Sequence, residues 1–318
     1  MPKKQLFYIV LILIIAAIIW LLSTNNKSTI SYDNKFAISD TASITKIFIA
    51  DRNGTTITLN RKKNNWVVNN KYDVRKDAIK TILSTIKQIK IQRLVSKNAF
   101  KNVIKNLATS GVKIEIYTNQ YTPNKTYTIG SSTANHLGTY MYLDGSKNPY
   151  VVHIPSFNGF LSPRYGIQGN KLSENDWRST KVFSLKAERI ERILLNHIQS
   201  PEKSFTFTTD SMILRNNLGN KETFNKKNAL KFLNAFKLLN CESYKNEKEK
   251  IEFSTPIHKL IVNNDTLRTY AISNDKLIID KKHNFTVKRM HATFNNRELM
   301  LIQDYVFNKV LITIDQLH

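Results

Sequence analysis

An uninterrupted apolar run near the N-terminus constrains this chain more than any other feature of its sequence. The run, Leu6 to Leu22, reads LFYIVLILIIAAIIWLL and contains neither a charge nor a strong helix breaker. At about 1.5 Å per residue, a helix of this length reaches about 26 Å, enough to cross the apolar core of a thin bilayer. A helix buried in a soluble core would show a polar stripe. The sequence therefore predicts a transmembrane anchor over residues 6–23.

The flanking charges predict how this anchor is oriented. Lys3 and Lys4 precede the run, whereas residues 23–26 are uncharged, and the positive-inside rule keeps the lysine side cytoplasmic. We therefore expect a single-pass protein of the inner (cytoplasmic) membrane, with a cytoplasmic tail at 1–5, a tether at 24–42 and a periplasmic remainder. The alternative is a cleaved signal peptide, which needs small residues at its cleavage site. Leu21-Leu22-Ser23-Thr24 places large residues there, so we favour a retained anchor.

Beyond the tether, the pattern predicts an α+β protein with mainly antiparallel sheets. Strand-like segments at 44–50 and 55–60 flank Asn53-Gly54, a strong hairpin signal, and Asp73 is positioned to cap a helix that follows. A similar order returns after Ile190, with Asn225 positioned to cap a second helix. We expect two repeated β-β-β-α-β units, at 43–185 and 186–318, with a closing helix at 297–307.

The charge of the chain has two interpretations. Lys and Arg number 48 against 24 Asp and Glu, for a formal net charge of +24. Such an excess favours an anionic partner, namely lipopolysaccharide, phospholipid or acidic glycan. The alternative is compositional drift, because Lys, Asn and Ile are all abundant, as an AT-rich genome would produce. The predicted topology places the basic domain away from the cytoplasm, so we expect no nucleic-acid partner.

The sequence offers no constellation that would support an enzyme. None of the seven histidines lies at metal-ligand spacing, and neither a nucleophile elbow nor a phosphate-binding glycine loop is present. The single cysteine, Cys241, ends the apolar face of a predicted helix and is interpreted as a core residue. We therefore expect no catalytic residues, no metal and no cofactor, with an unrecognised hydrolase as the weakest alternative.

One local cluster stands out between the two predicted units. It combines aromatic and arginine side chains, which are enriched where proteins bind partners. The candidate partner-binding residues are Phe160, Arg164, Tyr165, Trp177 and Arg178. The alternative is a linker whose Trp177 and Phe160 pack against both units.

The order of these features resembles the domain-of-unknown-function family numbered 4340, over most of residues 40–310. The resemblance is carried by short, mainly apolar motifs. These are Trp66-Val67-Val68, Tyr72-Asp73-Val74, Tyr127-Thr128-Ile129-Gly130, Tyr140-Met141-Tyr142-Leu143, Tyr150-Val151-Val152 and Trp177-Arg178 before Lys181-Val182-Phe183. The second half departs from the pattern, because it lacks a tryptophan at the position matching Trp66.

This resemblance implies an accessory protein of the cell envelope. Members of that family are often encoded beside gliding-motility-type ABC transporter components of Gram-negative bacteria, and the family carries no established active site. We therefore expect a non-enzymatic, membrane-anchored periplasmic accessory protein that acts through protein contacts with an ABC-type transport complex. The alternative is a binding module for the anionic envelope ligands named above.

Overall fold

The computed structural model describes residues 36–318, except for 64, 119–120, 170, 246–254, 273–277 and 281–284. The apolar run predicted as a transmembrane anchor lies outside the described residues. Within the described part of the chain, no helix is both long and apolar enough to span a bilayer. The chain divides into two compact units, Met1–Trp177 and Arg178–His318, which we call the first and the second unit.

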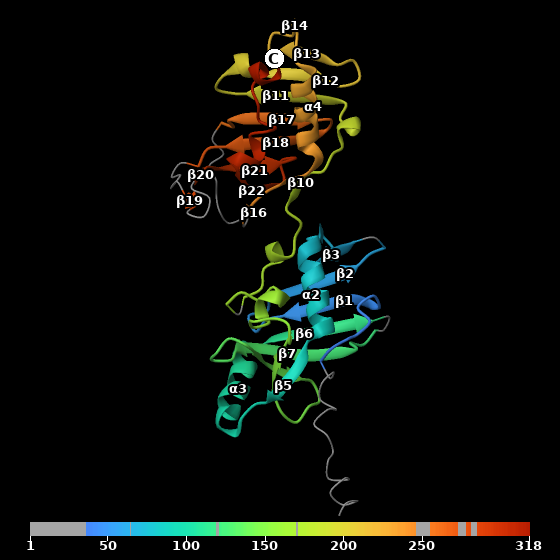
Figure 1. The fold of residues 1–318 in the computed structure, drawn as a ribbon, viewed down its shortest axis with the longest axis vertical. Coiled ribbons are helices and arrows are strands. Elements are labelled where there is room, and N and C mark those ends of the chain that lie inside the picture. The colour runs from blue at the N-terminus through green and yellow to red at the C-terminus, as the bar shows by residue number, and fades with distance from the viewer. Residues whose placement is uncertain are drawn as a thin grey trace, which may run out of the picture. The chain divides into compact units, whose positions relative to one another are not determined.

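The first unit is built on a nine-stranded sheet in which every pairing is antiparallel. The strands lie in the order β4-β3-β2-β1-β6-β7-β8-β9-β5 (Figure 1). Their bounds are β1 Ile44–Ala50, β2 Thr56–Arg61, β3 Trp66–Val68, β4 Tyr72–Asp73, β5 Lys90–Leu94, β6 Val112–Thr118, β7 Lys125–Ser132, β8 Thr139–Leu143 and β9 Tyr150–His153.

The second unit contains a nine-stranded antiparallel sheet of the same design, in the order β14-β13-β12-β11-β17-β18-β21-β22-β16. Its strands are β11 Arg192–His197, β12 Phe205–Thr208, β13 Ile213–Asn216, β14 Lys221–Glu222, β16 Ser243–Tyr244, β17 His258–Val262, β18 Asp265–Tyr270, β21 Arg289–Phe294 and β22 Glu298–Gln303. Two short ladders accompany it, β10 Lys181–Phe183 with β15 Leu239–Asn240, and β19 Ile278–Asp280 with β20 Phe285–Val287.

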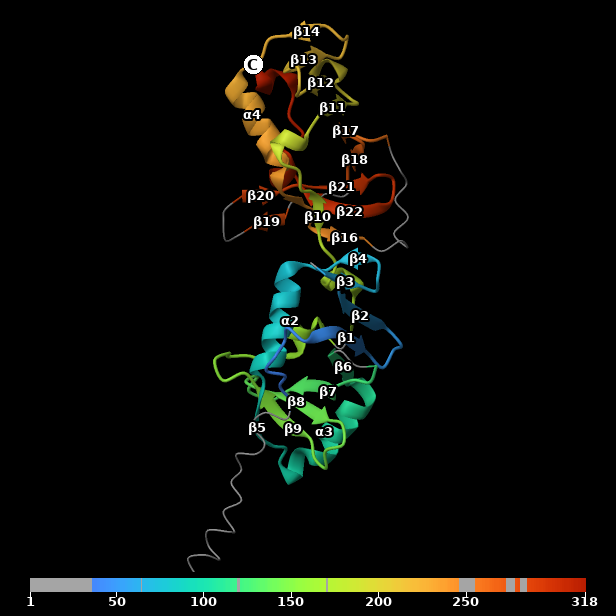
Figure 2. The same cartoon turned by 90° about the vertical axis from the view of Figure 1, so that its right-hand side faces the viewer.

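A helix covers one face of each sheet (Figure 1). In the first unit this helix is α2, Lys76–Gln88, and in the second it is α4, Lys226–Asn234. The first unit has a further helix, α3 (Lys97–Ser110), on the opposite face of its sheet (Figure 2). The short helices are η2 Ser162–Tyr165, η3 Glu174–Asp176, η4 Ala187–Arg189, η5 Pro201–Lys203, η6 Ala235–Lys237, α5 Asp304–Phe307 and η7 Ile314–Leu317.

Each unit has its own hydrophobic core between the sheet and its covering helix. In the first unit Ile47 and Ile49 of β1 are fully buried against Ile82 and Ile86 of α2. In the second unit Ile193 of β11 is buried in a core that includes Phe232 of α4. Alternate residues of a strand point to opposite faces, so the residues between the core positions form the other face of each sheet.

Cross-strand register shows which positions of the two sheets correspond. Ile47 pairs with Leu59 and Ile116 in the first unit, and Ile193 pairs with Phe207 and Val262 in the second. Because the strand order is the same, Ile47 corresponds to Ile193. The core residues at corresponding positions are all apolar, so the same alternation buries them in both sheets.

Two expectations about local structure are wrong. Residues 298–303 form strand β22 rather than a helix, because they pair along their whole length with β21, and only Asp304–Phe307 is helical. Asp73 does not cap α2, since it lies in β4 and accepts a hydrogen bond from the Asn65 side chain. Arg75 occupies the N-cap position instead, without a capping hydrogen bond from its side chain.

Candidate functional site

The structure places four of the five predicted partner-binding residues in the first unit. Tyr165 is fully buried, and its hydroxyl lies 2.8 Å from that of Tyr127. Trp177 is buried beside Gly166, whose φ of +67° lets the chain turn where a Cβ atom would meet the indole ring at 2.7 Å. Both aromatic side chains are therefore core residues with little surface to offer a partner.

Arg164 and Phe160 retain part of their surface. The Arg164 Nε donates a 2.7 Å hydrogen bond to Thr85 Oγ1 of α2, and its guanidinium lies 4.8 Å from the ring centroid of Phe157. The Phe160 ring lies 5.8 Å from the imidazole of His136. If this segment binds a partner, these two side chains are the ones placed to touch it, and the partner contact stays a prediction.

Arg178 is a buried part of the second unit. Its guanidinium lies 3.3 Å from the centroid of the Tyr244 ring and forms an ion pair with Glu298. The thiol of Cys241 belongs to the same cluster, and burial raises its pKa to about 11. A thiol with such a pKa is protonated at neutral pH and is a poor nucleophile, which fits the interpretation of Cys241 as a core residue.

The second unit's sheet carries a concentration of positive charge on the face opposite α4. Strand alternation places five cations there, and we call them the basic face. They are Arg192 of β11, Arg215 of β13, Lys221 of β14, Lys259 of β17 and Arg268 of β18. In the described strands of this sheet, no position on that face holds Asp or Glu. Arg289 lies on the same face but is neutralised by a bidentate pair with Glu242.

The basic face juxtaposes like charges. Lys259 is directly opposite Arg268 in the β17–β18 ladder, and Arg215 is directly opposite Lys221 in the β13–β14 ladder. Like charges directly opposite each other on one face destabilise a sheet. A bound anion would relieve this repulsion, so the arrangement is typical of a surface that is completed by a ligand.

The two paired arginines are held by neutral acceptors. Nη1 of Arg215 donates a 2.8 Å hydrogen bond to the carbonyl of Gly219, and Arg268 donates to the side-chain oxygen of Asn296. These contacts fix the side chains without cancelling their charge. Guanidinium groups that are oriented in this way can bind phosphate or carboxylate oxygens in a bidentate manner.

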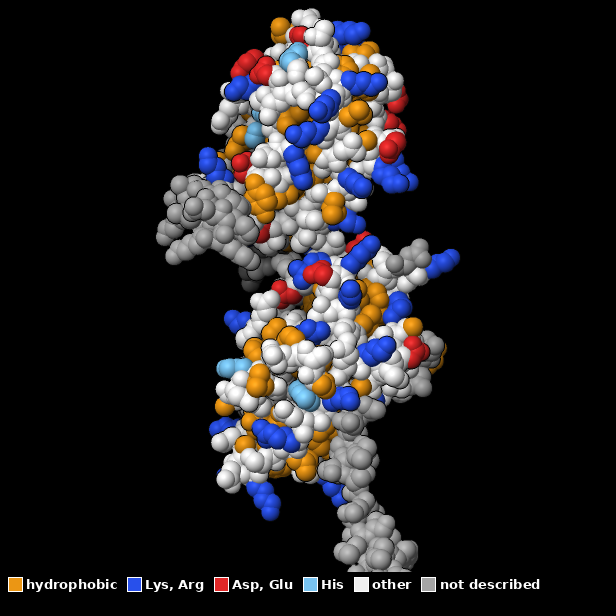
Figure 3. Space-filling view, viewed as in Figure 1, with side chains coloured by type: hydrophobic (Ala, Val, Ile, Leu, Met, Phe, Trp, Pro, Cys, Tyr) orange, Lys and Arg blue, Asp and Glu red, His pale blue; other side chains and the backbone are white. Residues whose placement is uncertain are grey.

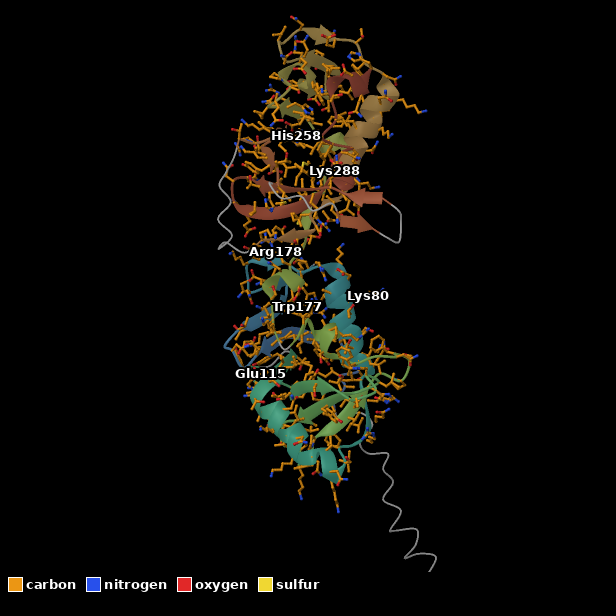
Figure 4. The ribbon with its side chains drawn as sticks, turned by 90° about the vertical axis from the view of Figure 1, so that its left-hand side faces the viewer. Lys80, Glu115, Trp177, Arg178, His258 and Lys288 are labelled. Carbon is orange, nitrogen blue, oxygen red and sulfur yellow. The ribbon has the colours of Figure 1, made fainter. Side chains whose placement is uncertain are left out.

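The corresponding face of the first unit is compensated internally. Lys113 occupies the position that corresponds to Lys259, and it forms a 2.6 Å ion pair with Glu115. Burial pushes the pKa of Glu115 up, but hydrogen bonds from Lys113 and Tyr117 outweigh it and hold this pKa below its ordinary value. In the second unit, Ile261 replaces the carboxylate. Figure 4 shows Glu115 on the side of the first unit away from Lys80 of α2.

A groove opens on the basic face, with a volume of about 510 Å³. Its floor includes Arg192, Leu194 and Asn196 of β11, Thr206 of β12 and Arg215 of β13, and its rim includes Pro201 and Gly219. The lining thus combines cationic, amide and hydroxyl groups with several apolar side chains. By contrast, Lys and Arg side chains are scattered over the face seen in Figure 3, so net charge alone does not define this site.

Two histidines pack together beside the groove. The ring centroids of His197 and His258 are 5.0 Å apart. His197 Nε2 lies 2.9 Å from the Ile312 carbonyl oxygen, and His258 Nδ1 lies 2.8 Å from Thr269 Oγ1. Burial, followed by the proximity of His197, lowers the pKa of His258 to about 4. Among the described residues, no three His, Cys, Asp or Glu side chains gather in a way that could hold a metal ion.

The sequence contained a signal for the basic face that was missed. Arg192, Lys259 and Arg268 each alternate with core residues inside a strand, whereas sequence reasoning looked for clusters of consecutive charges in turns. The face is assembled only by the register of β11, β17 and β18, which brings together residues that are far apart in the chain.

Comparison with known proteins identifies a family. A protein-family model described as Domain of unknown function (DUF4340) matches residues 66–256, which begin in β3 of the first unit and end after β16 of the second. No curated protein and no solved structure matches the chain.

Proposed function

The chain belongs to the family described as Domain of unknown function (DUF4340), and from that premise we propose a non-enzymatic, membrane-anchored envelope protein that binds an anionic ligand on its basic face. The single observation that carries this proposal is the charge at Lys259 and Arg268, which lie directly opposite each other on a face where the described strands of the sheet hold no Asp or Glu. The corresponding sheet of the first unit supplies the comparison, because there Glu115 neutralises Lys113.

The ligand that fits this face carries several phosphate or carboxylate groups. The cations are spread over five strands, so one small anion would reach only some of them. Lipopolysaccharide, anionic phospholipid and acidic glycan all present such repeated charges. An envelope location follows from the predicted anchor, which holds the second unit on the periplasmic side of the inner membrane.

An accessory role beside an ABC-type transport complex is the second candidate. Phe160 and Arg164 favour it, because both keep exposed surface in a segment that combines aromatic and arginine side chains. The two candidates are compatible, since a protein that presents an anionic envelope component to a transporter needs no catalytic group.

Equilibrium binding to soluble polyanions tests the proposed function. The full-length protein in a zwitterionic detergent is titrated with short-chain polyphosphate and, separately, with polygalacturonate, so that phosphate and carboxylate chemistry are distinguished. We expect the triple variant Arg192→Ser, Lys259→Ser, Arg268→Ser to bind at least about tenfold more weakly, a loss of about 1.4 kcal/mol. Binding by the native protein should weaken steeply with salt, because exposed charges are screened beyond about 10 Å at 0.1 M.

A charge-matched control separates a site from a general charge effect. The variant Lys227→Ser, Lys231→Ser, Lys237→Ser removes three exposed lysines from α4 and η6, on the opposite side of the same unit. This control should bind almost as tightly as the native protein. Equal losses in both variants would contradict the site. If neither polyanion binds while permease subunits co-purify in stoichiometric yield, protein contacts are the function.

A further inference from the structure

Helix α3 is held on the first unit by one narrow stripe. Ala99, Val103 and Leu107 recur at intervals of four and pack on the open face of the sheet, where they meet Val151 of β9. Side chains four residues apart lie on one face of a helix, so this stripe accounts for the inner surface only.

A second apolar stripe faces outward. Phe100 and Ile104 lie one turn apart, and each is 37% exposed. Removing such apolar surface from water is favourable. Phe100 and Ile104 thus give the outer side of α3 an apolar strip that a partner can cover.

A row of lysines borders this apolar stripe. Lys97, Lys101 and Lys105 recur every four residues and are exposed, and helical periodicity places Lys97 next to Phe100 and Lys101 next to Ile104. The helix contains no acidic residue. In Figure 3, blue and orange side chains lie together over the position of α3. Apolar side chains bordered by lysines are typical of helices that lie in the interface of an anionic membrane.

The path of the chain indicates which partner α3 meets. Residues 1–35 precede the described part, and they include the run predicted to anchor in the membrane. The described chain begins at Phe36, whose ring packs 5.9 Å from that of Tyr150, and Tyr150 is paired with Leu94 in the β9–β5 ladder. Because only residues 24–35 separate the predicted anchor from Phe36, the prediction keeps the first unit close to a bilayer, whose anionic headgroups complement the lysines of α3.

We propose that α3 docks the first unit onto the anionic phospholipid surface of that bilayer. Phe100 and Ile104 enter the interface between headgroups and acyl chains, and Lys97, Lys101 and Lys105 contact lipid phosphates. Long lysine stems cover apolar surface while their ammonium groups stay at headgroup level. This docking surface is separate from the basic face and does not depend on it.

An environment-sensitive fluorophore on α3 tests this proposal. In a Cys241→Ser background, the full-length protein is labelled at Ala108→Cys, an exposed position on the outer side of α3, and reconstituted in nanodiscs. Emission should shift to shorter wavelength in phosphatidylglycerol nanodiscs relative to phosphatidylcholine ones. A label at Lys80→Cys on α2, on the other side of the sheet, should not shift.

Two variants make the result decisive. Phe100→Ser with Ile104→Ser should abolish the shift, and Lys97→Ser with Lys101→Ser and Lys105→Ser should remove its dependence on phosphatidylglycerol. Phe100 and Ile104 are partly buried, so some loss of stability is expected, and the unfolding midpoint of each variant is measured to confirm that it is folded at the temperature of the experiment. The same emission in both lipids, or a shift that survives the Phe100 and Ile104 changes, would overturn the proposal. A concentration-dependent shift in lipid-free detergent would assign the surface to a second copy of the chain instead.

Discussion

Single positions decide the charge balance of the two sheets. Where the first unit has Glu115, the second has Ile261, and where the first has Thr128, the second has Arg268. The first change removes a carboxylate and the second adds a cation on the same face. These two differences between the units therefore distinguish the first sheet, where Glu115 compensates Lys113, from the second sheet, which keeps its positive charge.

The role of Glu115 as a compensating charge predicts a pH-dependent effect on stability. Because its pKa is lowered in the folded protein, its contribution is present above the unfolded pKa and is lost as pH falls through the folded value. Glu115→Gln should lower the free energy of unfolding at pH 7 by at most about 1 kcal/mol, since partly exposed ion pairs contribute roughly 0–1 kcal/mol. Near pH 3 the variant and the native protein should differ little.

Thermal unfolding measured from pH 3 to pH 8 checks this expectation. Glu202→Gln, an exposed carboxylate on η5, serves as the control and should behave like the native protein at every pH. A difference between Glu115→Gln and the native protein that stays constant down to pH 3 would show that the carboxylate charge is not what matters.

At the scale of elements, helix ends offer a test of the local structure. Asn225 Oδ1 accepts hydrogen bonds from the backbone N–H groups of Lys227 at 2.9 Å and Asn228 at 3.3 Å, which caps α4 as the sequence predicted. Asn225→Ala should cost about 1 kcal/mol in the free energy of unfolding, because it leaves those donors without their partner. Chemical denaturation measures this loss.

The N-terminus of α3 supplies a matched control. Ser96 occupies the N-cap position there, but its side chain makes no capping hydrogen bond. Ser96→Ala should therefore have a smaller effect than Asn225→Ala. Equal losses at the two positions would mean that the hydrogen bonds of Asn225 do not account for its effect.

Elements with strong local signals could be predicted from the sequence. The Asn53-Gly54 turn joins β1 to β2, and Gly54 has the positive φ of +84° that such a turn requires. The helix predicted at 297–307 was wrong. Glu298, Leu299 and Met300 are good helix formers, but pairing with β21 overrides that propensity. The consecutive positive-φ residues Asn295 and Asn296 mark a hairpin turn, and this Asn-Asn signal was overlooked.

The candidate site was less accessible to sequence reasoning than the fold. The predicted cluster at 160–178 was chosen for its aromatic and arginine content, and Trp177, Tyr165 and Arg178 use those same properties in packing. The basic face depends on register between strands, which no local pattern fixes. Lys259 faces Arg268 because the register of the β17–β18 hairpin pairs these two positions.

At the scale of the whole molecule, one sheet design is used twice with different surfaces. Both units order nine strands in the same way and place a helix over one face. The first unit covers part of its other face with α3 and pairs Lys113 with Glu115 there, whereas the second places five cations on that face, two of which line a groove. In this account the first unit meets the membrane and the second binds the ligand.

Lysine acetylation footprinting of the full-length protein tests this division most directly, because every lysine is compared within one molecule. With saturating short-chain polyphosphate, Lys259 and Lys221 of the basic face should be protected. Lys46 and Lys113 of the first unit, and Lys227 of α4, should be acetylated equally with and without the probe. Protection confined to the basic face is the result that we predict. Protection at Lys113 to the same degree as at Lys259, or at Lys227 alone, would contradict the proposed site.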